Sequence, residues 1–257
     1  MAPSHRKPDA EARRDHERMY GHGPVSEEEL KAKYPRWVRN FGKTLPFNDL
    51  LTGLFDPLND NKKRPSGPAV ARAKQGRHGP SNLSPHEVRR NIIDRFISRW
   101  RNEVGDDFYP ALRLILPEKD RDRPMYGLKE KAIGKLIVKV LKINPSSEDG
   151  HNLLNWKLPG QTTASRMAGD FAGRCYEVLS KRAMRQQAGD MRIAEVNELL
   201  DRLASVSKEE DQLPIFVTFY NRMNAEELQW LIRIILRQMK IGASEKTILE
   251  VCATQTV

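Results

Sequence analysis

The sequence predicts an all-α fold, and three observations support that prediction. Apolar residues recur every three or four positions from residue 85 almost to the C-terminus, which is the period of a helix. No stretch alternates apolar and polar residues for long enough to indicate a strand. The 257 residues are 39% hydrophobic and 30% charged, so the chain can bury a substantial core and still leave segments outside it.

The N-terminal part of the chain is polar, and we place the folded domain at residues 45–257, after an extension over residues 1–44. Within that extension, Ser26 followed by Glu29 predicts one short capped helix. The first helix of the core is entered through Pro46. Its apolar side chains are Leu45, Phe47, Leu50, Leu51, Leu54 and Phe55.

A segment of different composition follows at residues 56–84. It is rich in proline and contains an acid-free basic stretch from Lys62 to Arg77. Because few of its side chains could be buried, we predict a flexible loop over the whole segment. Beside a nucleic acid such a loop would also contact phosphates, so Lys62, Lys63 and Arg64 are additional candidate DNA-binding residues.

The apolar positions after this loop predict a succession of helices. They cover approximately residues 88–100, 109–116, 128–141, 171–179, 193–203, 213–220 and 228–239, and a last helix begins at Ser244. That last helix has barely two turns before the sequence stops, so we expect the chain to be a fragment of a longer protein.

Individual residues predict where several of these helices begin or end. Pro117 ends the second helix of the series, and Asp170 can cap the fourth. Pro214 suits the first turn of the sixth helix, because the missing N–H would be unpaired there in any case. Asn224 followed by Glu227 is a capping box that starts the penultimate helix.

The charge balance indicates an anionic partner. Lys and Arg number 44 against 34 Asp and Glu, which gives a formal net charge of +10. A basic excess of this size is typical of proteins that bind nucleic acid, an anionic membrane or an acidic protein. No apolar run is long enough to cross a bilayer, and we expect no membrane partner.

The motifs of common catalytic and metal sites are absent from the sequence. There is no Gly-rich Walker loop and no nucleophile elbow, and the six histidines are not spaced with Cys or carboxylates as metal ligands are. Asp149 and Gly150 are adjacent, but no Lys lies two residues before Asp149 to form a Lys-x-Asp-Gly nucleotidyl acceptor. We therefore expect no catalytic residue, no metal and no cofactor in this chain.

One predicted helix edge concentrates positive charge. Lysines follow one another at spacings of four, four and three residues, which places them along a single edge: Lys131, Lys135, Lys139 and Lys142. Lys129 adds a fifth charge. Like charges at such spacing are mutually destabilising, and we interpret the edge as a row of phosphate contacts. A solvated face whose lysine stems cover the edge of the core is the alternative.

Two stretches of the chain resemble each other. Each contains an Arg-(Leu/Ile)-Ile-Leu segment, a spacer of variable length, and then Gly-x-x-Glu-Lys-x-Ile, with Gly127 in the first stretch and Gly242 in the second. We predict two helix-corner-helix units, packed about a local two-fold axis with both corners on one face. Chance similarity between helical segments is the alternative.

The second unit shows what such a corner could bind. Gly242 can end the preceding helix in the left-handed conformation, and Ser244 can cap the next helix while leaving its first N–H groups open for a phosphate. Arg233, Arg237 and Lys240 fall together on the polar face of the preceding helix.

A pair of matched corners suits duplex DNA, because the duplex has two-fold axes perpendicular to its length. Contacts of this kind would hold the phosphate backbone without reading the base sequence. The candidate DNA-binding residues are Gly127, Lys129, Lys131, Lys135, Lys240, Gly242, Ser244 and Lys246. The rival interpretation is a helical protein-docking module whose basic face meets an acidic partner.

Four segments resemble the N-terminal DNA-binding domain of eukaryotic ATP-dependent DNA ligases, most closely those that seal double-strand breaks in non-homologous end joining. They are Phe108–Ile137, Ala168–Ala172, Val196–Ser205 and Gln229–Ile248. The similarity extends from about residue 45 to residue 252, apart from the basic loop. It implies an all-helical domain in a nuclear enzyme, with both corners on the minor groove of nicked or broken duplex DNA.

The same resemblance implies several partners outside this chain. Adenylation and oligonucleotide-binding domains follow in the family, and they supply the adenylated lysine and use ATP and magnesium. A coiled-coil end-joining partner binds a further C-terminal region. The family's helical surface can also dock a nuclease. We do not transfer that docking, because the segment between Trp100 and Phe108 is short and the additions at residues 1–44 and 56–84 are specific to this lineage.

Overall fold

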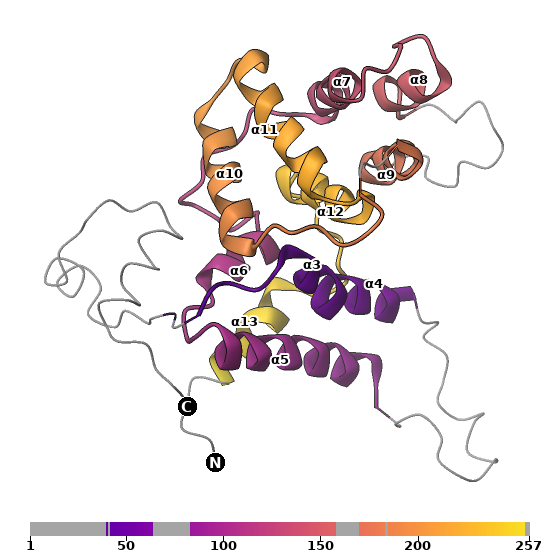
Figure 1. Cartoon of the computed structure of the whole chain (residues 1–257). Coiled ribbons are helices and arrows are strands. Elements are labelled where there is room, and N and C mark those ends of the chain that lie inside the picture. The colour runs from indigo at the N-terminus through magenta and orange to yellow at the C-terminus, as the bar shows by residue number, and fades with distance from the viewer. Residues whose placement is uncertain (1–39, 41, 64–82, 158–169, 183–184, 255–257) are drawn as a thin grey trace, which may run out of the picture.

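The computed structural model describes residues 40, 42–63, 83–157, 170–182 and 185–254, and these form helices joined by short connections (Figure 1). In chain order the elements are α3 (Phe47–Leu50), the π-helical turn η1 (Leu51–Phe55), α4 (Asp56–Lys63), α5 (Pro85–Glu103), α6 (Tyr109–Ile115), α7 (Glu130–Val140), α8 (Glu148–Leu154), α9 (Phe171–Arg182), α10 (Ile193–Ser205), α11 (Glu209–Arg222), α12 (Ala225–Ile235) and α13 (Glu245–Thr254). Within the described residues, extended backbone pairs only at two isolated bridges. The all-α prediction is confirmed.

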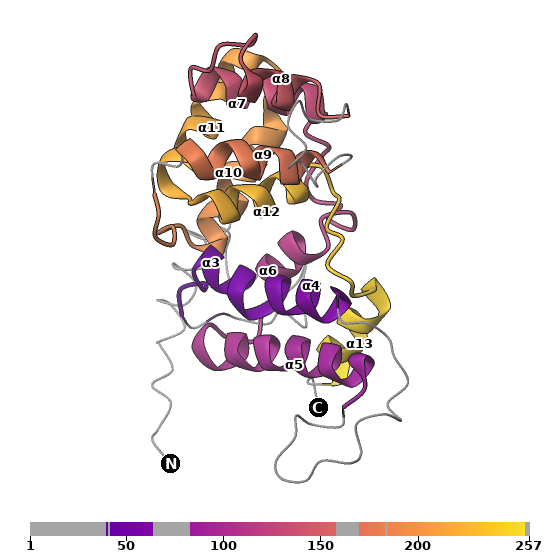
Figure 2. The ribbon, with the colours of Figure 1, turned by 90° about the vertical axis from the view of Figure 1, so that its right-hand side faces the viewer.

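The helices are arranged in two tiers (Figure 2). The upper tier contains α7 to α12, and the lower tier contains α3, η1, α4, α5, α6 and α13. The tiers meet where α12 rests on η1 and α4: the rings of Phe55 and Trp230 are 4.8 Å apart, and Trp230 Nε1 donates to Asp56 Oδ1 at 3.1 Å. One continuous apolar core runs through both tiers, with Trp100 fully buried in the lower one. The two tiers are therefore parts of one packed body.

The first helical stretch runs further than the sequence predicted. We expected a loop from residue 56, but α4 continues to Lys63 and buries both Leu58 and Asn61. Pro57 is tolerated because the π-helical turn directly precedes it, with the N–H of Asp56 bonding to the carbonyl of Leu51, so the hydrogen-bond register shifts before the proline. The prediction of a loop over residues 56–84 was therefore wrong for its first eight residues. Residues 64–82 lie outside the described part of the chain.

The packed structure also includes residues before position 45. Thr44 is fully buried, and its hydroxyl accepts from the backbone N–H of Ala194 at 3.1 Å. The side chain of Asn40 accepts from the N–H of Asp107 at 3.0 Å. These contacts attach Asn40 and Thr44, which precede α3, to the connection between α5 and α6 and to α10. The helix predicted from Ser26 lies outside the described residues.

Several helix boundaries differ from the sequence-based prediction. The capping box of Asn224 and Glu227 forms as predicted at the start of α12. In contrast, α11 begins at Glu209, so Pro214 lies inside that helix and not in its first turn. Pro214 is exposed, so water can reach the carbonyl that loses its donor. The short helix α8 was not predicted; Ser147 caps it by accepting from the N–H of Gly150 at 3.2 Å.

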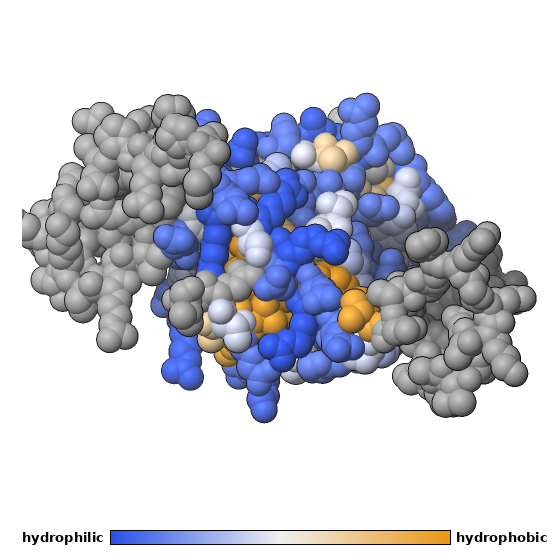
Figure 3. Space-filling model, turned by 90° about the horizontal axis from the view of Figure 1, so that it is seen from below, coloured by the Kyte–Doolittle hydropathy of each residue, from blue (hydrophilic) through white to orange (hydrophobic). Residues whose placement is uncertain are grey.

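The underside of the molecule is mostly hydrophilic. Figure 3 shows this face, which α5 and α13 form, with small apolar patches between charged side chains. Leu249 of α13 is one of the few large apolar side chains of the described surface that are clearly exposed.

Candidate nucleic-acid interface

The two predicted corners have the same backbone conformation at their glycine, although Lys240 of the second is left-handed (φ 46°) and Met125 of the first is not. We define the first corner as residues 125–131 and the second corner as residues 240–246. Gly127 has φ 64° and Gly242 has φ 73°, values that favour glycine. In each case the preceding residue is buried and the next helix begins three residues after the glycine, at Glu130 and Glu245. The repeat in the sequence is therefore also a repeat in structure.

The chain segments that carry the corners lie side by side and run in opposite directions. The first segment rises from α6 in the lower tier to α7, and the second descends from α12 in the upper tier to α13 (Figure 2). Arg237 Nη2 donates to the carbonyl of Arg123 at 3.0 Å, and Lys119 Nζ is 2.8 Å from a carboxylate oxygen of Glu245. Opposite directions are what a local two-fold axis between the two units requires.

A buried polar network holds the first segment in place. Arg113 donates to Asp120 at 2.9 Å and to Asp201 at 2.7 Å. Arg123 donates to Asp201 at 2.7 Å and to Asn197 at 2.8 Å. Burial alone would raise the pKa of Asp201, but the bond from Arg113 and the charge of Arg123 lower it. The network ties the non-helical segment before Gly127 to α6 and α10, where regular backbone pairing cannot do so.

The lysines of α7 separate into two groups. Lys129, Lys131 and Lys135 are exposed, and no carboxylate of the described residues pairs with any of them. Lys139 pairs with Glu209 of α11, so its charge is compensated. Of the predicted row of four phosphate-binding lysines, the first two, Lys131 and Lys135, therefore carry uncompensated charges. Lys129 adds a third such charge at the N-terminus of α7.

Both α7 and α12 end in the same way, and this corrects one prediction. Lys142 (φ 51°) follows α7 and Arg237 (φ 55°) follows α12, each in the left-handed conformation. The N–H of Arg237 bonds to Ile234 and that of Gln238 bonds to Arg233, which is the Schellman pattern. We predicted that Gly242 ends α12, and this is wrong, because α12 already ends before Arg237. Gly242 turns the chain again just before α13.

The cations of the second corner have more partners than predicted. Arg233 is 2.8 Å from Asp170 and lies over the ring of Trp230, so its charge faces inward and does not join Lys240 on a basic face. The carboxylate of Asp170, which we expected to cap α9, is used in this pair. Lys240 is exposed, and Lys246 lies 3.7 Å from Glu250.

Ser244 and Lys62 lie where the second corner turns. The hydroxyl of Ser244 accepts from the N–H of Thr247 at 3.2 Å, so it caps α13 as predicted. A Cβ atom at Gly242 would be 2.9 Å from the Cβ of Lys62, which brings the end of α4 against this corner. Lys63 ends α4, and Arg64 lies outside the described residues.

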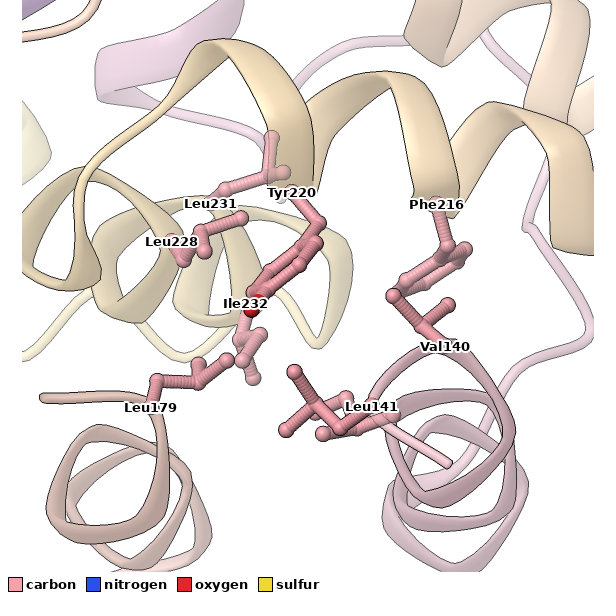
Figure 4. Close-up of a pocket in the computed structure, with 9 residues that line it drawn as sticks. Val140, Leu141, Leu179, Phe216, Tyr220, Leu228, Leu231 and Ile232 are labelled. Atoms are coloured by element: carbon pink, nitrogen blue, oxygen red, sulfur yellow. The ribbon is translucent and has the colours of Figure 1, made fainter. Parts of the chain in front are cut away.

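A cavity of about 170 Å³ lies between the two segments. Its lining comes from residues 115–119 and 239–243 and from Glu245, whose ion pair with Lys119 lies on it. Sequence reasoning did not single out Lys119, because its partner is far away in the sequence. A second hollow, between α7, α9, α11 and α12, is lined by apolar side chains and by Tyr220 (Figure 4). Tyr220 uses its hydroxyl to donate to the carbonyl of Arg182, so this hollow offers little to a phosphate.

The described residues include no group of three or more His, Cys, Asp or Glu side chains that could hold a metal ion. None of the described helices is both long enough and apolar enough to span a bilayer. The two corners offer a ligand the exposed cations Lys129, Lys131 and Lys240 and the N-termini of α7 and α13.

Comparison with known proteins gives a consistent result. A family model described as DNA ligase N terminus matches residues 46–253. DNA ligase 4 of Coccidioides immitis is 65% identical over 236 residues, which are 91% of this chain and 24% of that protein. DNA ligase 4 of Neurospora crassa is 60% identical over 95% of this chain and 23% of its own length. DNA ligase 4 of Yarrowia lipolytica is 45% identical over 82% of this chain and 20% of its own length. The chain spans about a quarter of the length of these relatives.

Proposed function

Because the chain belongs to the family of DNA ligase N-terminal domains, we propose that it holds nicked or broken duplex DNA for strand joining. The observation that carries this proposal is the pair of matching corners, which lie on adjacent antiparallel segments and display uncompensated lysines. An isolated basic helix would be consistent with many partners. A basic corner repeated on two antiparallel segments fits a partner that has two-fold axes itself.

The contacts would be made mainly to phosphates. At the first corner, Lys129 and Lys131 reach solvent beside the open N–H groups at the start of α7, and Lys135 reaches solvent about one turn further along the helix. At the second corner, Lys246 takes the place of Lys131, and Lys240 adds a charge two residues before Gly242. The glycine at each turn lets the backbone approach the sugar edge of the minor groove closely. Such contacts position a protein on duplex DNA without selecting a sequence.

For the whole protein we propose a nuclear ATP-dependent DNA ligase that acts in double-strand break repair by non-homologous end joining. The resemblance in the corner segments supports this proposal, together with relatives named DNA ligase 4. Adenylation and oligonucleotide-binding domains would complete the clamp on DNA and would use ATP and magnesium. A coiled-coil partner would bind a C-terminal region outside this chain. We assign no nuclease-docking surface and no catalytic step to the chain itself.

The test is fluorescence anisotropy of a nicked duplex titrated with the chain at several salt concentrations. We expect roughly micromolar binding that weakens linearly in a log–log plot, with a slope of about −0.9 for each phosphate neutralised. Lys131→Glu combined with Lys135→Glu should weaken binding at least about tenfold, because two attractive contacts become repulsive. Lys181→Glu combined with Lys208→Glu makes the same charge change on α9 and before α11, and it should have a much smaller effect.

Two outcomes would contradict the proposal. One is equal binding by the wild type and the Lys131/Lys135 double variant. The other is binding to an acidic polypeptide with no binding to duplex at low salt, which would favour a protein-docking module.

A further inference from the structure

The two corners differ at the position two residues before the glycine. The second corner has Lys240 there, which is exposed and charged. The first corner has Met125, whose exposed fraction is 77%, whereas the other exposed large apolar side chains of the described residues have between 37% and 43%. One corner therefore presents a cation and the other presents the most exposed large apolar side chain of the described surface.

The backbone on both sides of Met125 is fixed. On one side, Arg123 is buried and bonded to Asp201 and Asn197. On the other side, Tyr126 is buried and its hydroxyl oxygen lies 3.3 Å from Arg123 Nη1. Pro124, between Arg123 and Met125, has its backbone φ fixed by its own ring. An exposed methionine on a flexible loop would need no explanation, but here the fold holds the side chain in solvent at little further entropic cost on binding.

We propose that Met125 lies against deoxyribose and base edges in the minor groove of bound duplex, while the lysines of the two corners hold the phosphates. This inference rests on the proposed function. The faces of the sugars that line the minor groove are apolar, and an unbranched thioether can adapt to them. Apolar side chains, methionine among them, are used in this way by other proteins that bind the minor groove. Because Lys240 takes the equivalent place, the protein contacts the two halves of its site unequally.

An apolar contact and an ionic contact differ in their response to salt, and this makes the inference testable. Loss of a phosphate contact changes the slope of the log–log salt plot, whereas loss of apolar burial shifts the line without changing its slope. The experiment is the anisotropy titration of a nicked duplex at several salt concentrations, with the wild-type chain and the variants Met125→Ala, Met125→Leu and Met125→Lys.

We expect Met125→Ala to bind about five to ten times more weakly at every salt concentration, with the wild-type slope. Met125→Leu should stay within about twofold of the wild type, because it keeps the apolar volume. Met125→Lys should steepen the slope by about one unit, since it copies the second corner. Val217→Ala, which trims an exposed apolar residue of α11, should bind as the wild type does. Thermal unfolding of each variant checks that the fold is retained.

The outcomes separate this inference from the proposed function. If the wild type binds and Met125→Ala binds equally well, Met125 makes no contact and only this inference is overturned. The same holds if Met125→Ala changes the slope, because the loss would then be ionic. If the wild type does not bind the duplex at low salt, the proposed function and this inference are both overturned.

Discussion

At the first corner the space beside Gly127 is open, and no heavy atom would lie within 4 Å of an added Cβ. At the second corner Gly242 lies against Lys62, and Ser244 and Lys246 are both engaged with neighbours in α13. The backbone angles of the two glycines are nearly the same. The difference shows that the repeated sequence sets the conformation of the corner glycine, while the surrounding helices set how much of the corner is free for a ligand.

The largest expected effect comes from removing the support of the first corner. Arg123→Ala would remove the more deeply buried of the two arginines that pair with Asp120 and Asp201 and would leave both carboxylates to Arg113 alone, so we expect the free energy of unfolding to fall by about 3 kcal/mol. Duplex binding should weaken too, because the segment before Gly127 loses its attachment. Urea denaturation measures the first effect. Arg121→Ala removes an exposed arginine two residues away and should change stability by less than about 0.5 kcal/mol. Equal effects of the two variants would contradict a structural role for the network.

The next largest effect should distinguish the two glycines. Both alanine variants place a side chain at positive φ, which costs about 1–2 kcal/mol. Gly242→Ala adds a clash with Lys62, so we expect it to destabilise the protein by about 1 kcal/mol more than Gly127→Ala does. Urea denaturation again gives the comparison. Lys62→Ala retains the Cβ that makes the closest contact, so most of the difference should persist in that background. If the difference in stability vanishes in that background, the clash is with the lysine side chain beyond its Cβ atom.

A smaller effect should separate the lysines of the two corners. Lys131 has no carboxylate partner in the described part of the chain, whereas Lys246 lies near Glu250. We therefore expect Lys131→Ala to reduce the salt slope of duplex binding by about one unit and Lys246→Ala to reduce it by less. Anisotropy titrations at four or more salt concentrations would give both slopes. A larger reduction for Lys246 would show that the second corner carries more of the ionic contact.

The smallest expected effect concerns pH. The pKa of Asp201 is lower in the folded protein than in the unfolded chain, so the unfolded state binds more protons near the ordinary aspartate pKa. Its contribution to stability is present above that value and is lost as pH falls through the lower folded pKa. Because Asp201 is partly exposed, we expect less than about 1 kcal/mol. Urea denaturation between pH 3 and pH 6 should show a weaker acid dependence for Asp201→Asn than for the wild type.

Features that depend on near neighbours were predictable from the sequence. The capping box at Asn224 requires only residues within one turn, and the conformation at Gly127 and Gly242 follows from a short repeated segment. The prediction was wrong at Pro57 and Pro214, where proline was taken as a signal that a helix is absent or only beginning. A π-helical turn accommodates the first proline and an exposed position accommodates the second.

The sequence by itself determined the helices, the two corners and the excess of basic residues, because periodicity, caps and composition act over a few residues. Only the tertiary structure decided which charges remain free. Lys139 is compensated by Glu209, and Arg233 by Asp170, across long separations in the chain. The exposure of Met125 likewise depends on how Arg123 and Tyr126 are buried by α10 and by the neighbouring segment. Such pairings arise when distant helices pack, and no local pattern encodes them.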